Sequence, residues 1–231
     1  MVLNKQKGNM YGFVTHTWNP IKGKCSHDCS YCYMKRWGEQ KGLSMSQKEL
    51  HNLGKDNFIF VGSSTDMFAD DVPTDWIIEV LDHCGKYNNN KYLFQTKNPK
   101  RFNEFLKEFP EGSILCITLE SDYIKDGIHK APLPIERAIS FRDLDWNENS
   151  KMITIEPIIK FNYFALLSWI EGINPFQVNI GADSQRHNLK EPSKGEVEKL
   201  IFELKKFTNV FEKDNLKRLL KRSSDEPRVN K

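Results

Sequence analysis

The sequence lacks the features that mark membrane and secreted proteins. It has no run of roughly 18 consecutive apolar residues, the length that a membrane-spanning helix needs. Its first ten residues, MVLNKQKGNM, contain no apolar centre like that of a signal peptide. It also has no repeat of fixed period and no low-complexity tract. We therefore expect a cytoplasmic protein without a membrane partner.

Cysteine is scarce, with five residues in a chain of 231. Cys25, Cys29 and Cys32 lie close together in the sequence, whereas Cys84 and Cys116 stand alone in apolar surroundings. Cysteines that are so few and so clustered do not form a disulfide framework. We expect the isolated pair to act as small hydrophobic residues and the cluster to serve metal or redox chemistry.

Charge is nearly balanced over the whole chain, with a net charge of +3, but it is unevenly distributed. Residues 1–41 contain seven basic side chains and two acidic ones. An excess of positive charge beside the cysteines indicates an anionic neighbour, although a solvated surface gives the same pattern. The same two interpretations apply to a basic cluster near the C-terminus, formed by Lys217, Arg218, Lys221 and Arg222.

Short apolar runs that alternate with amphipathic stretches predict a parallel β-sheet covered by helices. The expected strands are 12–15, 57–61, 92–94, 114–119, 152–155, 177–180 and 209–212. They make roughly six or seven β/α units, fewer than the eight of a TIM barrel. This count predicts an α/β protein with a partial TIM-like barrel, with a doubly wound open sheet as the alternative. We expect a single domain over residues 1–231, in which 208–231 could form a C-terminal strand, a helix and a tail.

Helices are expected between these strands. One begins at Pro73 and has an apolar stripe made of Trp76, Ile77, Val80, Leu81 and Cys84. Another covers residues 132–142 and is expected to bury Ile135, Ala138 and Ile139 against the core. A third, over 161–171, is expected to end before Gly172, because glycine commonly ends a helix.

The loop after the first expected strand carries the cysteine cluster. Residues 23–33 read GKCSHDCSYCY, a CxxxCxxC arrangement. Iron–sulfur clusters normally take four cysteine ligands, so a loop with three leaves one iron of a cubane cluster open to another molecule. S-adenosylmethionine (SAM) can fill that place through its amino and carboxylate groups. The spacing therefore predicts a [4Fe–4S] cluster held by Cys25, Cys29 and Cys32, with SAM as a second cofactor.

This spacing, with an aromatic residue directly before the third cysteine, resembles the radical SAM superfamily. The segments THTWNP, CSHDCSYCY, VGSSTDMF, QTKNP, TLESD, IEPI and NIGADS resemble a phage- and prophage-associated branch, related in pattern to spore photoproduct lyase. The resemblance implies a partial (βα)6 TIM-like barrel with SAM across the strand ends, and a flavodoxin- or ferredoxin-type electron donor. It also implies reductive cleavage of SAM to a 5′-deoxyadenosyl radical, which abstracts hydrogen from a substrate.

The resemblance also places residues at the SAM site. Tyr31, just before the third cysteine, is expected near the adenine. Gly62, Ser63, Ser64 and Asp66 follow the second strand, where the superfamily has a segment that holds the SAM amino group. The common double-glycine-Glu form is absent here, but hydroxyl and carboxylate oxygens can still accept hydrogen bonds from an ammonium. The alternative role for this segment is a turn with an Asp cap for the following helix.

Polar residues at the later strand ends should surround the same mouth, because barrel sites form where strands end. We expect Gln95, Thr118 and Glu120 to contact SAM, and Lys97 and Glu156 to serve the substrate. A loop-stabilising role is the alternative for each of them. No catalytic residue can be assigned from the sequence.

Other functions fit parts of the pattern. A zinc site of the Cys3His type would use the three cysteines and His27. The chain would then be a zinc- or cluster-stabilised nucleic-acid-binding module without SAM turnover. A further alternative is non-radical transfer of a methyl group from SAM. For the substrate, the basic segments and the resemblance favour a nucleotide or nucleic acid, with a metabolite or peptide as the alternative.

Overall fold

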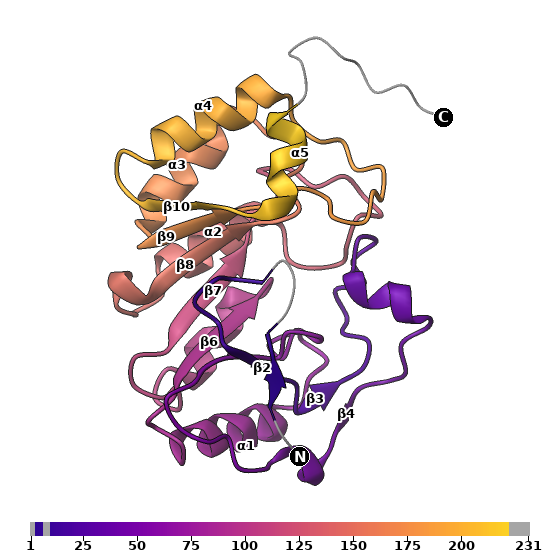
Figure 1. Ribbon diagram of the computed structural model, residues 1–231, viewed down its shortest axis with the longest axis vertical. Coiled ribbons are helices and arrows are strands. Elements are labelled where there is room, and N and C mark those ends of the chain that lie inside the picture. The colour runs from indigo at the N-terminus through magenta and orange to yellow at the C-terminus, as the bar shows by residue number, and fades with distance from the viewer. Residues whose placement is uncertain (1–2, 7–9, 222–231) are drawn as a thin grey trace.

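The computed structural model describes residues 3–6 and 10–221 and has a curved, mainly parallel sheet at its centre (Figure 1). The strands lie in the order β1-β2-β5-β6-β7-β8-β9-β10. Among the described strands of this sheet, only β1 runs antiparallel to its neighbour. The strands are β1 (Asn4–Lys5), β2 (His16–Trp18), β5 (Phe58–Val61), β6 (Lys91–Thr96), β7 (Ile114–Thr118), β8 (Lys151–Ile155), β9 (Gln177–Ile180) and β10 (Asn209–Glu212).

Helices follow most of the strands, as the parallel connections require. Their neighbours in space are also their neighbours in sequence, with α2 against α3 and α3 against α4. The α-helices are α1 (Thr74–Gly85), α2 (Pro134–Arg142), α3 (Tyr163–Ile173), α4 (Lys194–Leu204) and α5 (Lys217–Leu220). The 3-10 helices are η1 (Tyr33–Trp37), η2 (Gln47–Glu49), η3 (Pro99–Phe105), η4 (Glu148–Ser150) and η5 (Asp214–Leu216).

The two faces of the sheet are covered differently, because successive side chains of a strand point to opposite sides. One face packs into the large apolar core together with the helices, through Ile59, Val61, Tyr92, Phe94, Leu115, Ile117, Ile153, Ile155, Val178 and Ile180. The alternate residues Phe60, Leu93, Cys116 and Met152 form a second cluster on the other face, which Tyr11 and Val14 complete. Residues 10–14 therefore fill the interior of the partial barrel from one end.

The start of the sheet differs from the sequence prediction. The expected first strand, 12–15, is an irregular segment that packs inside the barrel, and β2 begins only at His16. A turn in which the Val14 N–H donates to the Tyr11 carbonyl, at 3.0 Å, interrupts the extended backbone. The apolar residues that suggested a strand are thus buried by filling the barrel rather than by pairing in the sheet.

Two helix predictions were also wrong in detail. Ala138 of α2 is buried as expected, but Ile135 and Ile139 are exposed, and the helix buries Arg137 and Phe141 instead. A buried ion pair of Arg137, described below, sets the orientation of this helix. Helix α3 continues through Gly172 to Ile173 and ends at Asn174, which takes the left-handed conformation at φ 51°. Asparagine can occupy the helix-ending position that glycine usually takes.

Other predictions are confirmed. The stripe of α1 buries Ile77, Val80, Leu81 and Cys84, with Trp76 partly buried beside them. The remaining strands lie where the apolar runs predicted them, and 209–212 is the last strand of the sheet. Among the described residues, no helix has both the length and the hydropathy needed to cross a membrane.

Candidate functional site

The cysteine loop lies on an arm that projects beside the sheet, in indigo and violet in Figure 1. Two short antiparallel strands, β3 (Ile21–Lys22) and β4 (Ser44–Met45), close the arm, and the Lys24 N–H donates to the Lys41 carbonyl at 2.9 Å. Gly23 has a φ of 112°, and a Cβ there would lie 2.4 Å from the carbonyl oxygen of Gly42. Glycine is therefore required where the two sides of the arm meet.

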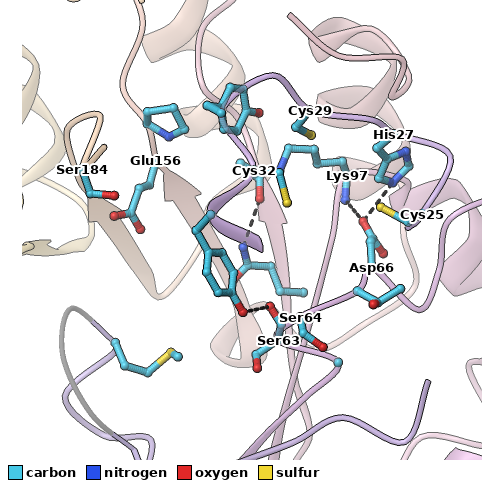
Figure 2. A pocket seen from close by; sticks show the side chains of 18 of the residues that line it. Cys25, His27, Cys29, Cys32, Ser63, Ser64, Asp66, Lys97, Glu156 and Ser184 are labelled. Atoms are coloured by element: carbon cyan, nitrogen blue, oxygen red, sulfur yellow. Dashed lines mark hydrogen bonds and ion pairs between the residues drawn. The ribbon is translucent and has the colours of Figure 1, made fainter. Parts of the chain in front are cut away.

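All three clustered cysteines line one cavity of about 500 Å³ between the arm and the carboxyl ends of the strands (Figure 2). Its volume lies in the range of about 300–1,000 Å³ that small-molecule sites occupy. Two turns shape the loop: the Asp28 N–H donates to the Cys25 carbonyl and the Cys32 N–H to the Cys29 carbonyl. Burial raises the pKa of Cys25 to about 11 and also raises that of Cys29. A bound metal would offset this penalty, because it favours the thiolate form.

The two metal groups expected from the sequence place different demands on the donor set. Within residues 3–6 and 10–221, no three His, Cys, Asp or Glu side chains converge on one point as a mononuclear site requires. A [4Fe–4S] cluster takes each cysteine on a different iron, so its ligands need only surround a common space. The Nε2 atom of His27, the fourth ligand of the zinc alternative, is 2.9 Å from Asp66 Oδ2. The three thiols that line this cavity are the donor set that a cubane cluster with one open iron would need.

Most of the residues expected at the SAM site line this same cavity. They are Tyr31, Gly62, Ser63, Ser64, Asp66, Gln95 and Thr118, and the residues expected to serve the substrate, Lys97 and Glu156, line it as well. Glu120 is not among the lining residues. Asn19, which the sequence did not single out, accepts hydrogen bonds from the Ser63 hydroxyl at 3.1 Å and the Ser64 N–H at 2.8 Å.

Asp66 joins the arm to the barrel. Its carboxylate accepts hydrogen bonds from His27 Nε2, the Thr96 hydroxyl, and the Lys97 and Phe68 N–H groups. Burial opposes ionisation of Asp66, but His27 and these donors together hold its pKa below the ordinary value. Because four donors already converge on this carboxylate, the geometry favours a positioning role over direct acceptance of a SAM ammonium.

Glu120 lies behind the cavity wall in a buried network. Its carboxylate is 2.7 Å from Arg137 Nη1, and neither side chain has any exposed surface. Tyr31 donates its hydroxyl to Glu120, and Arg137 Nη2 lies 2.8 Å from His129 Nε2. Burial opposes ionisation of Glu120, yet Arg137 and Lys97 lower its pKa to about 2; burial lowers the pKa of His129 to about 4. The network thus anchors the aromatic residue of the cysteine loop to the end of β7.

The sequence missed Arg137, whose only signal was its place on a helix face beside Ala138 and Phe141. It also missed the far end of the cavity. There the Lys213 ammonium pairs with Glu156 and lies 4.7 Å from the ring centroid of Tyr11. The Tyr11 hydroxyl donates to Gln95 at 2.7 Å, and Gln95 Nε2 donates to Thr118 at 3.1 Å. Tyr11, Gln95 and Thr118 are therefore joined by hydrogen bonds across the barrel interior, and we call these three side chains the polar barrel floor.

The basic cluster near the C-terminus is largely paired. Lys217 lies 2.7 Å from Asp214, and Arg218 Nη1 donates to Glu191 at 2.7 Å. Arg222, the last member of the predicted cluster, lies outside the described residues. Because two of its charges are matched locally, this cluster offers less to a phosphate backbone than its sequence indicated.

Taken together, fold and site define a partial barrel whose cysteine-bearing arm lies against a cavity at the strand ends. The chain belongs to the family described as "Protein of unknown function (DUF5131)", whose model matches residues 10–160. A search of curated proteins finds no match.

Solved structures of spore photoproduct lyase share the fold. One with a dinucleoside spore photoproduct is 12% identical, with a TM-score of 0.64, and the match covers 90% of this chain and 78% of that one. Another, with bound AdoMet and the dinucleoside, is 13% identical, with a TM-score of 0.57 and coverage of 87% and 64%. At this identity the likeness concerns the fold alone, and it confirms the predicted partial TIM-like barrel.

Proposed function

We propose that this chain is a radical SAM enzyme that acts on a nucleotide or nucleic acid. The cluster would be held by Cys25, Cys29 and Cys32, and SAM would lie in the cavity between these thiols and the strand ends. The observation that carries the proposal is the meeting of all three thiols with Ser63, Ser64 and the polar barrel floor at one cavity. When bound, the cluster and SAM would supply a reductively generated radical that abstracts hydrogen from a substrate.

The residues of the chain would position these groups. Asn19 orients Ser63 and Ser64, which present a hydroxyl and backbone groups to the SAM amino acid moiety. Glu120 fixes Tyr31, whose ring stands between the cysteine loop and the barrel. The Lys97 ammonium lies 5.5 Å from the centre of that ring and 3.7 Å from Glu120, so it places a positive charge at the cavity wall beside the buried carboxylate.

The substrate class rests on two observations. The cavity end opposite the cysteines is polar, with Glu156, Lys213 and Ser184 in its wall, which suits a ligand rich in hydrogen-bonding groups. The structural neighbours carry a dinucleoside in the corresponding fold, which supports the same class. A flavodoxin- or ferredoxin-type protein would supply the electron.

Anaerobic reconstitution with iron and sulfide tests the proposal. We expect about four irons per chain and a broad charge-transfer absorbance that bleaches on reduction. Dithionite with SAM should then release 5′-deoxyadenosine and methionine, which chromatography separates. Cys25→Ala, Cys29→Ala and Cys32→Ala should each lose the release of both products.

Cys84→Ala is the matched control, because Cys84 is fully buried in α1, away from the cavity, and its loss should leave iron content and cleavage intact. One tightly bound zinc, no iron uptake and no 5′-deoxyadenosine would instead support the nucleic-acid-binding module without SAM turnover. Methylated product without 5′-deoxyadenosine would indicate non-radical transfer.

A further inference from the structure

The segment directly after the third cysteine exposes aromatic rings that the fold leaves unburied. Trp37 has 69% of its surface exposed and Tyr33 has 40%, and η1, which contains both, has no buried residue. Exposed aromatic rings beside a cavity offer flat apolar surface to a ligand or partner. The proposed SAM site does not use Trp37, which is not among the residues that line the cavity.

A guanidinium lies between the two rings. Arg36 Cζ is 4.8 Å from the ring centroid of Trp37 and 5.6 Å from that of Tyr33. Arginine and aromatic side chains both offer flat faces, and unpaired bases of single-stranded nucleic acids stack on such faces. We call Tyr33, Arg36 and Trp37 the stacking platform.

The stacking platform starts at the mouth of the cavity. Tyr33 and Arg36 line the cavity, whereas Trp37 lies beyond the lining, farther along η1. The Tyr33 hydroxyl donates to the Ser63 carbonyl at 3.0 Å, which fixes η1 against the loop that follows β5. A nucleotide inside the cavity would therefore have its neighbour in the strand next to Arg36 and Trp37.

Positive charge lies on the same arm. Lys24, Lys35 and Lys130 all place their ammonium groups within 3.1 to 3.5 Å of one carboxylate, that of Asp28. One negative charge cannot balance three positive ones, so an excess remains beside the stacking platform. Such an excess attracts the phosphates of a nucleic-acid backbone.

We propose that the stacking platform binds the bases next to the target nucleotide in a single-stranded or locally unpaired nucleic acid. The inference rests on the proposed function and deepens it, because it makes the substrate a strand rather than a free nucleotide. The flat faces account for base binding, the lysines around Asp28 account for phosphate binding, and the position at the mouth connects both to the cavity.

Binding of a labelled single-stranded oligonucleotide to the reconstituted protein at low salt tests the inference. Stacking on one aromatic side chain strengthens binding by a factor of about 5 to 150. We expect Trp37→Ala and Arg36→Ala each to weaken binding within that range, and Trp37→Phe to retain most of the affinity. A mononucleotide should bind Trp37→Ala and the unmodified protein equally.

Phe202→Ala is the matched control. Phe202 is 64% exposed on α4 and has the Lys206 ammonium 4.8 Å from its ring centre, so it repeats the aromatic–cation pair away from the cavity. Its removal should leave oligonucleotide affinity unchanged. Equal affinity of Trp37→Ala and the unmodified protein, or an equal loss in Phe202→Ala, would overturn the inference.

Two further outcomes distinguish a failure of this inference from a failure of the proposed function. Release of 5′-deoxyadenosine by the unmodified protein tests the proposed function independently of any oligonucleotide. If Trp37→Ala slows only the cleavage driven by a reduced flavodoxin and keeps its oligonucleotide affinity, the stacking platform serves the electron donor and the inference is wrong.

Discussion

The cysteine-bearing arm and the rim of strand ends meet at one cavity, but they are held in place by different means. The rim is fixed by a continuous parallel ladder from β2 to β10 and by a buried apolar core. The arm, residues 23–43, is closed by two strands of two residues each and fastened through a few polar contacts, among them Tyr31 with Glu120 and His27 with Asp66. The conformation of the cysteine loop can therefore change when a cluster binds, while the sheet and its core stay as they are.

The polar contacts between arm and rim are few, so each should matter. The Thr65 hydroxyl donates to the Gly23 carbonyl at 2.8 Å, and the Ser30 N–H donates to the Ile128 carbonyl at 2.7 Å. Both contacts use backbone carbonyls of loops rather than side chains of the core. The comparison therefore predicts that substitutions in the rim lower the global stability of the fold. Substitutions that remove the polar contacts between arm and rim should instead alter ligand binding in the cavity first.

The largest effect is expected at the buried ion pair behind the rim. Arg137→Met removes the nearest cation from the buried Glu120 carboxylate and leaves Lys97 at 3.7 Å, and breaking such a buried pair costs about 3–5 kcal/mol. Denaturant unfolding should show a much lower midpoint. Arg142→Met is the control in the same helix, because Arg142 pairs with Asp143 on the exposed surface; it should change little. Similar stability of both variants would show that the buried pair does not hold the rim.

The same network should make stability depend on pH. The pKa of Glu120 is depressed to about 2 and that of His129 to about 4, whereas unfolded chains have values of about 4.3 and 6.5. The unfolded state therefore binds more protons, and stability falls as pH drops from about 6.5 toward 4 and again toward 2. His129→Gln should remove the first of these declines. An unchanged slope between pH 6.5 and 4 in this variant would assign the decline to other groups.

The comparison also explains what could be predicted from sequence. Short continuous apolar runs located most of the rim strands, because a strand that is covered on both faces is apolar along its length, and this is a property of each strand by itself. The cysteine spacing identified the loop for the same reason, since its ligands are local in sequence. Arg137, Lys213 and Asn19 could not be found in this way, because their roles depend on partners more than 15 residues away, and nothing in their local pattern indicates those partners.

A smaller effect is expected at the fastening of Asp66. Asp66→Ala removes the acceptor of four hydrogen bonds and should cost about 1–3 kcal/mol, while Ser64→Ala should leave stability nearly unchanged. Both variants should weaken SAM binding in calorimetric titration while retaining cluster absorbance. If Asp66→Asn, which keeps an acceptor oxygen, restores stability but not SAM affinity, then Asp66 contacts SAM directly; recovery of both would indicate positioning.

The smallest effect is expected from the basic cluster near the C-terminus. Affinity for a single strand falls as salt rises, and each phosphate contact makes the slope of log affinity against log salt concentration more negative by about 0.7. Lys217 already pairs with Asp214, whereas Lys24 and Lys130 share Asp28 with a third lysine. Replacing Lys24 by Ala should therefore flatten the salt dependence of oligonucleotide binding, as should replacing Lys130, whereas replacing Lys217 should leave it nearly unchanged. The reverse result would place the nucleic acid along α5, on the rim side of the molecule, rather than on the arm.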